Sequence, residues 1–137
     1  MTELNTDTYT KQTAGKLETK KGTADTTLHV TTAEIELSSA AANDTINLFR
    51  VPVGCRIINV KVDTDKLGTG VSLDVGDKDD GDRYIDGANT GKTGGCSESC
   101  LIDGIGFTPS AGNSVIIAKN LGGSASGTLK ATVLYAV

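Results

Sequence analysis

The stretch CRIINVKVD, residues 55–63, decides the fold class. Side chains of an extended chain alternate between two faces, so Ile58, Val60 and Val62 fall on one face and the polar residues between them on the other. A strand with one apolar face belongs to a sheet with one buried side, and two such sheets packed face to face bury both apolar sides. The stretch therefore predicts a β-sandwich.

Short β-branched runs separated by turn residues continue in both directions, in a chain that holds 17 glycines. In the last run, Leu129 and Val133 again share one face. Near the start, the apolar positions change parity between Val30 and Ile35, which predicts a β-bulge or strand break near residues 31–34. We expect an all-β, antiparallel, jelly-roll-like β-sandwich of about eight strands. The expected strands are residues 28–37, 45–51, 55–63, 71–75, 83–85, 100–107, 114–121 and 128–137.

The first 25 residues differ from the rest of the chain. They hold equal numbers of acidic and basic residues and only Leu4, Tyr9 and Leu17 as sizeable apolar groups, so they cannot bury enough surface to order themselves alone. We expect residues 1–25 to be a flexible, extended N-terminal arm that binds a partner, and residues 26–137 to be the β-sandwich domain. An ordinary frayed terminus is the alternative.

The acidity of the chain is local. Residues 74–86 contain six aspartates against Lys78 and Arg83, a net charge of −4, which equals the formal net charge of the whole chain. With no basic stripe and only two Phe and three Tyr for base stacking, the sequence predicts no nucleic-acid partner. We expect the run to be a hairpin tip in water, since Asp and Gly favour turns.

The residues in and after this run resemble two functional motifs, an EF-hand loop and a P-loop. Neither motif is present, because the required residues do not occur at the required spacing. An EF-hand frame that starts at Asp77 has Gly81 at ligand position 5 and Ala88 at position 12, so neither required carboxylate is present. An irregular carboxylate site remains an alternative. A P-loop needs four residues between its first glycine and its Gly-Lys-Ser/Thr. Here only three residues separate Gly87 from the Gly-Lys-Thr that begins at Gly91. We therefore predict no metal site and no nucleotide site.

The three cysteines, Cys55, Cys96 and Cys100, form an odd count that favours reduced thiols. On one strand, Cys96 and Cys100 would lie about 13 Å apart, too far for a disulfide, so a bridge there would need a turn. A zinc site of the three cysteines with His29 is a weak alternative, because a single C-x₃-C pair leaves the other two ligands scattered along the sequence. We expect His29 on a strand surface. With one histidine and no nucleophile elbow, we predict no catalytic residues, no cofactor and no enzyme activity.

No apolar run approaches the roughly 20 residues of a membrane span, and the first residues lack the apolar region of a signal peptide. We expect a soluble protein with no membrane contact, made in a cytoplasm.

The run LFRVPVGCRIINVKVDTDKLGTGVSLDVGDKDDGDRYIDG, residues 48–87, resembles small virion proteins of tailed bacteriophages. In these proteins a VP-x-G-x-R-I strand entry precedes V-x-V-D-x-D-x-L and then an L-x-V-G-D-x-D-D-x-D-R-Y-I hairpin. The family is that of capsid cement or decoration (head-stabilising) proteins, which are small β-sandwich or jelly-roll modules on the outside of the shell. The resemblance covers about 40 of the 137 residues and contains no catalytic residues. It implies that Val71, Leu73, Val75 and Tyr84 pack inward, while the acidic tip turns into water or touches basic residues of the shell.

The resemblance implies a viral structural protein that binds the major capsid protein on the outer surface of the phage head. It also implies a homo-dimer or homo-trimer on a symmetry axis, a virion location, and synthesis in the bacterial host cytoplasm. A tail or neck structural protein is the first alternative. A carbohydrate-binding β-sandwich module ranks lower, because the chain has no Trp and only 4% aromatic residues.

Overall fold

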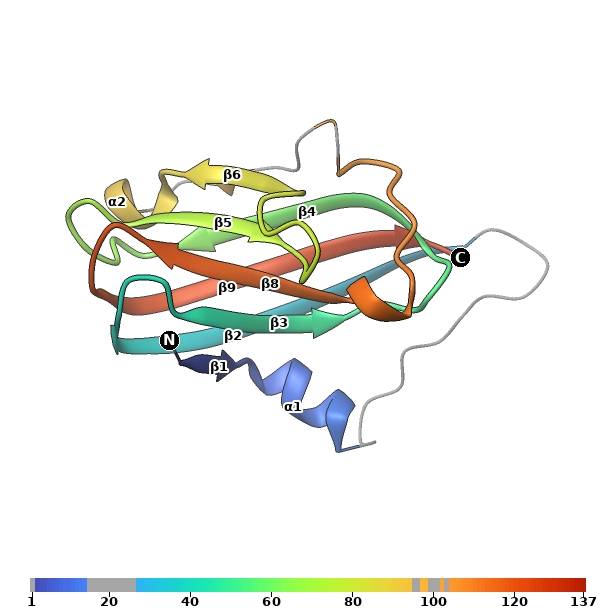
Figure 1. Ribbon diagram of the computed structural model, residues 1–137, viewed down its shortest axis with the longest axis horizontal. Helices are drawn as coiled ribbons and strands as arrows, with labels where there is room; N and C mark the ends of the chain where they lie inside the picture. Colours follow the sequence, from blue (N-terminus) through green and yellow to red (C-terminus); the bar gives the residue numbers. More distant parts are fainter. Residues whose placement is uncertain (1, 15–26, 95–96, 99–101, 103) are drawn as a thin grey trace.

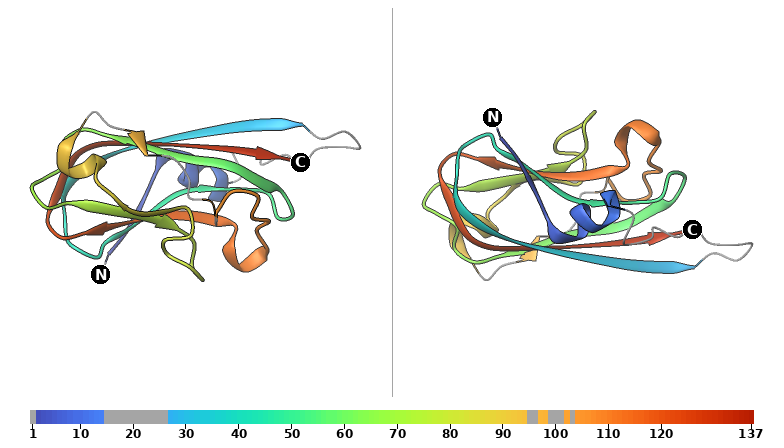
Figure 2. Two further views of the ribbon diagram at one scale, coloured as in Figure 1. Left: turned by 90° about the horizontal axis from the view of Figure 1, so that it is seen from above. Right: turned by 90° about the horizontal axis from the view of Figure 1, so that it is seen from below.

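A computed structural model describes residues 2–14, 27–94, 97–98, 102 and 104–137. Two β-sheets pack face to face, as the views from above and from below in Figure 2 show. The five-stranded sheet has the order β1 (Glu3–Asn5), β3 (Thr45–Arg50), β8 (Val115–Leu121), β5 (Ser72–Gly76) and β6 (Ile85–Ala88). The four-stranded sheet has the order β2 (Leu28–Ala40), β9 (Ala125–Ala136), β4 (Arg56–Thr64) and β7 (Ser97–Glu98) (Figure 1). The short helices are α1 (Asp7–Thr13), α2 (Thr90–Thr93) and the 3₁₀ turn η1 (Ala111–Asn113).

The strand pairing is that of a rolled antiparallel ribbon. Strand β2 pairs with β9, β3 with β8, β4 with β7, and β5 with β6, so the second half of the domain runs back along the first. Rolling this ribbon brings β9 beside β4 and β8 beside β5, which completes the two sheets. These eight strands form the jelly roll that the sequence predicts, and the all-β sandwich is confirmed. Strand β1 is a ninth strand, outside the ribbon, and pairs in parallel with β3.

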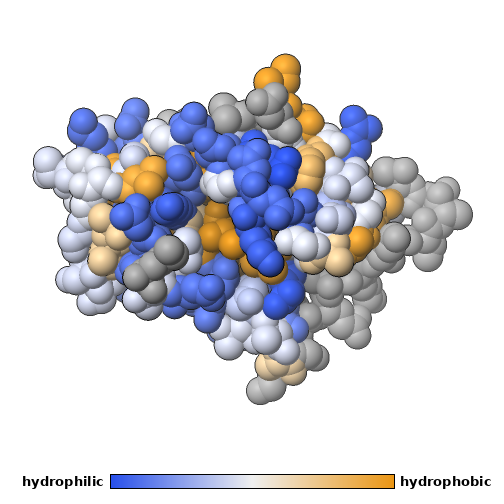
Figure 3. All heavy atoms as spheres, viewed as in Figure 1, coloured by the Kyte–Doolittle hydropathy of each residue, from blue (hydrophilic) through white to orange (hydrophobic). Residues whose placement is uncertain are grey.

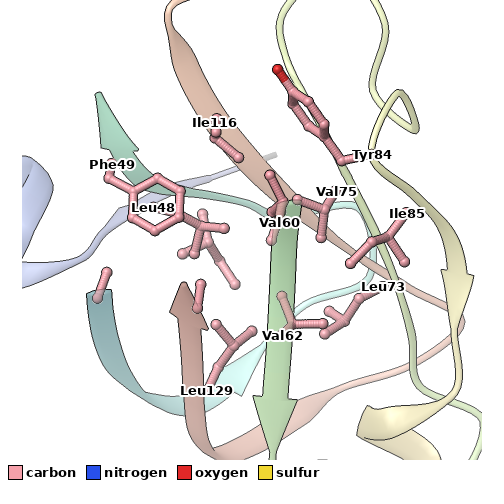
Figure 4. Packing of buried hydrophobic residues seen from close by; sticks show 14 of the residues in the cluster. Leu48, Phe49, Val60, Val62, Leu73, Val75, Tyr84, Ile85, Ile116 and Leu129 are labelled. Carbon is pink, nitrogen blue, oxygen red and sulfur yellow. The ribbon is translucent and has the colours of Figure 1, made fainter. Parts of the chain in front are cut away.

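The core lies between the two sheets. Val60 and Val62 of β4 are fully buried and face Leu73 and Val75 of β5 across the sandwich (Figure 4). Tyr84, which comes just before β6, is also fully buried, and its ring packs edge-on against Phe107 with the centroids 6.4 Å apart. The expected inward packing of Leu73, Val75 and Tyr84 is therefore confirmed.

The predicted bulge near residues 31–34 is wrong. Strand β2 stays in register with β9 from Leu28 to Leu37, and the irregularity comes only before Ala40, where Ser39 has φ of 52°. The apolar parity changes because Leu28 and Val30 point outward on this edge strand and remain 59% exposed, whereas Leu37 points into the core.

A second register shift, between Ile57 and Asn59 of β4, makes Ile57 the buried residue. The prediction that Ile58 shares the inner face of Val60 and Val62 is therefore also wrong, because the bulge turns it outward.

The strand expected at residues 100–107 is not a strand in its described part. Residues 104–106 form turns, and Phe107 donates its N–H to the carbonyl oxygen of Gly104. Gly106 has φ of 84°, a backbone conformation that suits glycine and ends extended pairing. The strand expected at residues 83–85 begins only at Ile85, since the preceding residues belong to the turn. None of the helices in the described ranges combines the length and the apolar character needed to cross a membrane.

Candidate interaction surfaces

The acidic loop, residues 74–86, is built around a buried carboxylate rather than a fully exposed tip. The Asp77 side chain has no exposed area, and its carboxylate accepts the backbone N–H groups of Asp79 at 2.9 Å and Asp80 at 3.0 Å. Arg83 donates its Nε–H to the same carboxylate at 2.6 Å, and its guanidinium lies 3.8 Å from the centroid of the Phe107 ring. The hydrogen bond to Asp77 raises the pKa of Arg83. Asp77 and Arg83 therefore hold the loop in one conformation, and the prediction that Asp77 turns into water is wrong.

Close backbone packing at Gly76 completes this loop. A Cβ atom there would lie 2.1 Å from the carbonyl oxygen of Asp80, so any other residue would push the turn open. The loop folds back directly on the end of β5, and glycine is the residue that allows it.

Three of the remaining five carboxylates of the loop gather in a group that no sequence motif predicts. Side-chain oxygens of Asp74, Asp82 and Asp86 lie within 4.8 Å of one another, and Asp74 also accepts the N–H of Gly87 at 2.8 Å. A hydrogen bond with Asp80 and the neighbouring negative charges raise the pKa of Asp82. The EF-hand frame is not assembled, since Asp77 is already engaged within the protein. That this loop holds no metal stays a prediction.

The glycine-rich stretch after the acidic loop has a structural role. Residues 90–93 make a single helical turn, in which the N–H groups of Lys92 and Thr93 bond to the carbonyl oxygen of Asn89. Gly91 is buried, and a Cβ atom there would lie 2.8 Å from Val71. The stretch packs against the sheet, and its helix ends at Thr93, whereas a P-loop requires an extended helix after the glycine-rich turn.

The cysteines and His29 do not form a common site among the described residues. Cys55 is a buried free thiol, and burial raises its pKa to about 11. Cys96 and Cys100 lie outside the described residues. His29 lies on β2, as expected, but is only half-exposed: its ring stacks on Tyr135 with the centroids 5.3 Å apart, and its Nε2 atom is buried.

The N-terminal segment, residues 2–14, is bound along the free edge of β3. Strand β1 places Leu4 beside Ile46 and Asn5 beside Asn47, and the Asn47 side-chain amide donates to the Asn5 side-chain oxygen at 2.9 Å. Helix α1 then lies at the side of the sandwich where β2 and β3 are the outermost strands of the roll (Figure 2). The sequence predicts one flexible arm over residues 1–25, whereas the structure places residues 2–14 along β3 of the same chain. Residues 15–26 lie outside the described residues.

Two side chains of this segment replace strand pairing beyond β1. Thr6 is fully buried, donates its hydroxyl to the Leu48 carbonyl and accepts the N–H of Tyr9, so it also caps α1. The Gln12 carboxamide donates to the Arg50 carbonyl at 3.1 Å and accepts the Arg50 N–H at 2.7 Å, as a strand residue would. The Arg50 guanidinium lies 4.9 Å from the centroid of the Tyr9 ring. The edge of β3 is therefore covered by matched polar contacts.

Large hydrophobic side chains are exposed at one end of the sandwich, where β2 and β4 begin and β9 ends. Val30 pairs with Leu134, and the β4 bulge sets Ile58 beside Leu134 on the same outer face. Ile105 adjoins them, because Gly106 and Ile57 are joined by a backbone hydrogen bond. We name this surface the apolar end; its members are Leu28, Val30, Ile58 and Ile105, which are 38–59% exposed, together with the half-buried Leu134. Figure 3 shows hydrophobic residues at the surface where β9 ends and a hydrophilic band over the acidic loop.

Comparison by sequence finds no matching protein-family model and no matching curated protein. Comparison by structure finds the same fold in two phage capsids. A chain of the capsid asymmetric unit of cyanophage Pam1 has a TM-score of 0.72 at 21% identity, over 88% of this chain and 92% of that one. A chain of the capsid of Ralstonia phage GP4 has a TM-score of 0.73 at 22% identity, over 98% of this chain and 97% of that one. Each match covers nearly all of both chains, so the fold is shared as a whole module.

Proposed function

We propose that the chain is a non-enzymatic structural protein of a phage capsid and, more narrowly, a cement or decoration protein on the outer surface of the head. The observation that carries this proposal is the match to chains of two phage capsids over most of the length of both chains in each comparison. The phage-like motif of residues 48–87 also supports the proposal, and it is a resemblance in sequence rather than in fold. The motif extends from β3 to β6 of the sandwich.

Such a protein acts by binding energy. A module that binds the assembled shell and not dispersed subunits shifts the equilibrium toward the shell, and it resists the outward pressure of packaged DNA. Contacts to two or more subunits, or a dimer or trimer of the module, strengthen this effect through multivalency. The partners under this proposal are the major capsid protein and further copies of the chain.

The apolar end supplies a surface for this binding. Contiguous exposed apolar groups in a soluble domain mark protein contact sites more often than isolated ones do. The acidic loop is less suited to carry the affinity, because its innermost carboxylate is already paired with Arg83 and exposed charge pairs contribute at most about 1 kcal/mol. We therefore assign shell attachment to the apolar end.

Particles made with and without the chain test the function. Particles without it should assemble with normal geometry but burst at lower temperature, and added protein should restore resistance at a fixed ratio to the major capsid protein. Val30→Lys should abolish the rescue, whereas Ser38→Lys, a lysine at the far end of the same strand, should leave it intact. A protein that does not bind shells would contradict the proposal. A copy number that fits a single vertex or the tail would favour the tail or neck alternative instead.

The carbohydrate-binding alternative gains no support from the described aromatic residues. Phe49, Tyr84 and Tyr135 are buried in the core, so they offer no platform to a sugar ring. The rings of Tyr9 and Phe107 are half-buried, and each has an arginine guanidinium over its face.

A further inference from the structure

We propose that the edge of β3 is an acceptor site for residues 2–14 of a second copy of this chain, so that adjacent copies exchange their N-terminal segments. An exchanged segment would make the same contacts on its neighbour that it makes on its own chain. This inference concerns the isolated protein and goes beyond the proposed function without resting on it.

The acceptor site recognises particular side chains. It binds the Gln12 carboxamide with both backbone groups of Arg50, and it buries Thr6 against the Leu48 carbonyl. The register of β1 is set by the Asn5–Asn47 amide contact. A segment of this sequence is therefore the ligand that the edge fits, and any copy of the chain can supply it.

The segment can leave without opening the core. Strand β1 has three residues, lies outside the paired ribbon β2–β9, and places only the partly buried Leu4 against the core cluster. Most of its other contacts are hydrogen bonds that water replaces on release, at a net cost of about 1 kcal/mol each. The eight-stranded roll stays complete after release, so exchange requires no unfolding of the domain.

The connection to the domain is long enough for exchange. The 12 residues 15–26 join Ala14 to Thr27, a path that spans at most about 45 Å when extended. A compact chain of this length has a radius of gyration of about 14 Å and is thus about 37 Å across. Because a short tether gives an effective concentration in the millimolar range, dilute protein keeps its own segment and crowded copies exchange it.

A disulfide trap tests this. Glu3 and Thr45 are register partners on adjacent strands, so Glu3→Cys and Thr45→Cys can form a disulfide in a chain that also carries Cys55→Ala, Cys96→Ser and Cys100→Ser. After equilibration and oxidation, non-reducing electrophoresis should show monomer at about 10 μM and roughly half covalent dimer or larger at about 1 mM.

The matched control is Lys61→Cys with Thr132→Cys, register partners on β4 and β9 inside the roll, which should give monomer at both concentrations. A test pair that stays monomeric at about 1 mM, or a control pair that dimerises equally, would overturn the proposal. The wild-type chain gives a second measurement: in a mixture of isotope-labelled and unlabelled protein at about 1 mM, filtered NMR spectra should show Leu4 of one copy near Ile46 of another. Absence of that contact would refute exchange even if the cysteine variants failed to fold.

Discussion

Replacing the buried aspartate of the acidic loop should destabilise the protein far more than replacing its exposed neighbour. Asp77→Ala removes the acceptor for two backbone N–H groups and for the Arg83 guanidinium, whose side chain is only 18% exposed. The arginine would then stay partly buried over the Phe107 ring without its counter-ion.

The expected loss follows from these contacts. Breaking a buried ion pair from one side costs about 3–5 kcal/mol, and hydrogen bonds to a charged group contribute about 1.5–3 kcal/mol each. Since the loop borders water, the freed groups can be partly rehydrated, so we take the lower end, about 3 kcal/mol. For a chain of this length that loss lowers Tm by about 10 °C. Asp79→Ala, on the exposed side of the same turn, should change the free energy of unfolding by less than about 0.5 kcal/mol.

Urea denaturation measures the free energy of unfolding of each protein. The proteins to compare are the wild type, Asp77→Ala, Asp79→Ala, Arg83→Ala and the double variant Asp77→Ala/Arg83→Ala. The double variant should lose less than the sum of its two single losses, because either substitution alone already breaks the pair. Equal stability of the Asp77 and Asp79 variants would show that Asp77 is not the centre of the loop.

Further outcomes are expected. Millimolar Ca²⁺ should leave Tm unchanged, since the EF-hand frame at residues 77–88 is not assembled; a rise of several degrees would reveal a carboxylate site. Because burial raises the pKa of Cys55 to about 11, the native thiol should react slowly with iodoacetamide at about pH 8, and the stability from the buried neutral thiol should be lost as pH rises from 9.0 toward that value. A variant with all three cysteines changed to Ser should still melt cooperatively, at a lower Tm because one hydroxyl is buried; loss of folding or stoichiometric zinc in the wild type would contradict this. Limited proteolysis should cut the free chain at Lys16, Lys20 or Lys21 and leave a resistant core, with slower cutting on assembled particles; equal rates in both would make the segment a plain terminus.

The sequence by itself determined the class of fold and most of the strands of the roll. Alternation such as that of Val60 and Val62 depends only on neighbouring residues, because an extended backbone directs every second side chain to one face. The sequence also excluded the P-loop and EF-hand motifs from nearby residues alone, because both motifs require a fixed spacing. The phage-like run of residues 48–87 was also readable directly from the chain.

The tertiary structure alone decided which individual residues are buried and where the interaction surfaces lie. Ile58 and Leu28 look like core residues, but the first lies in a bulge and the second lies on an edge strand, and both positions depend on pairing with β9. Asp77 looks like a solvated turn residue, but Arg83, six residues later, and Phe107 beyond it make a buried site for its charge. The N-terminal segment contains too little apolar surface to order itself, and it is placed by the hydrogen-bonding groups of β3, more than thirty residues away. Such outcomes depend on groups distant in the chain, and a local pattern cannot determine them.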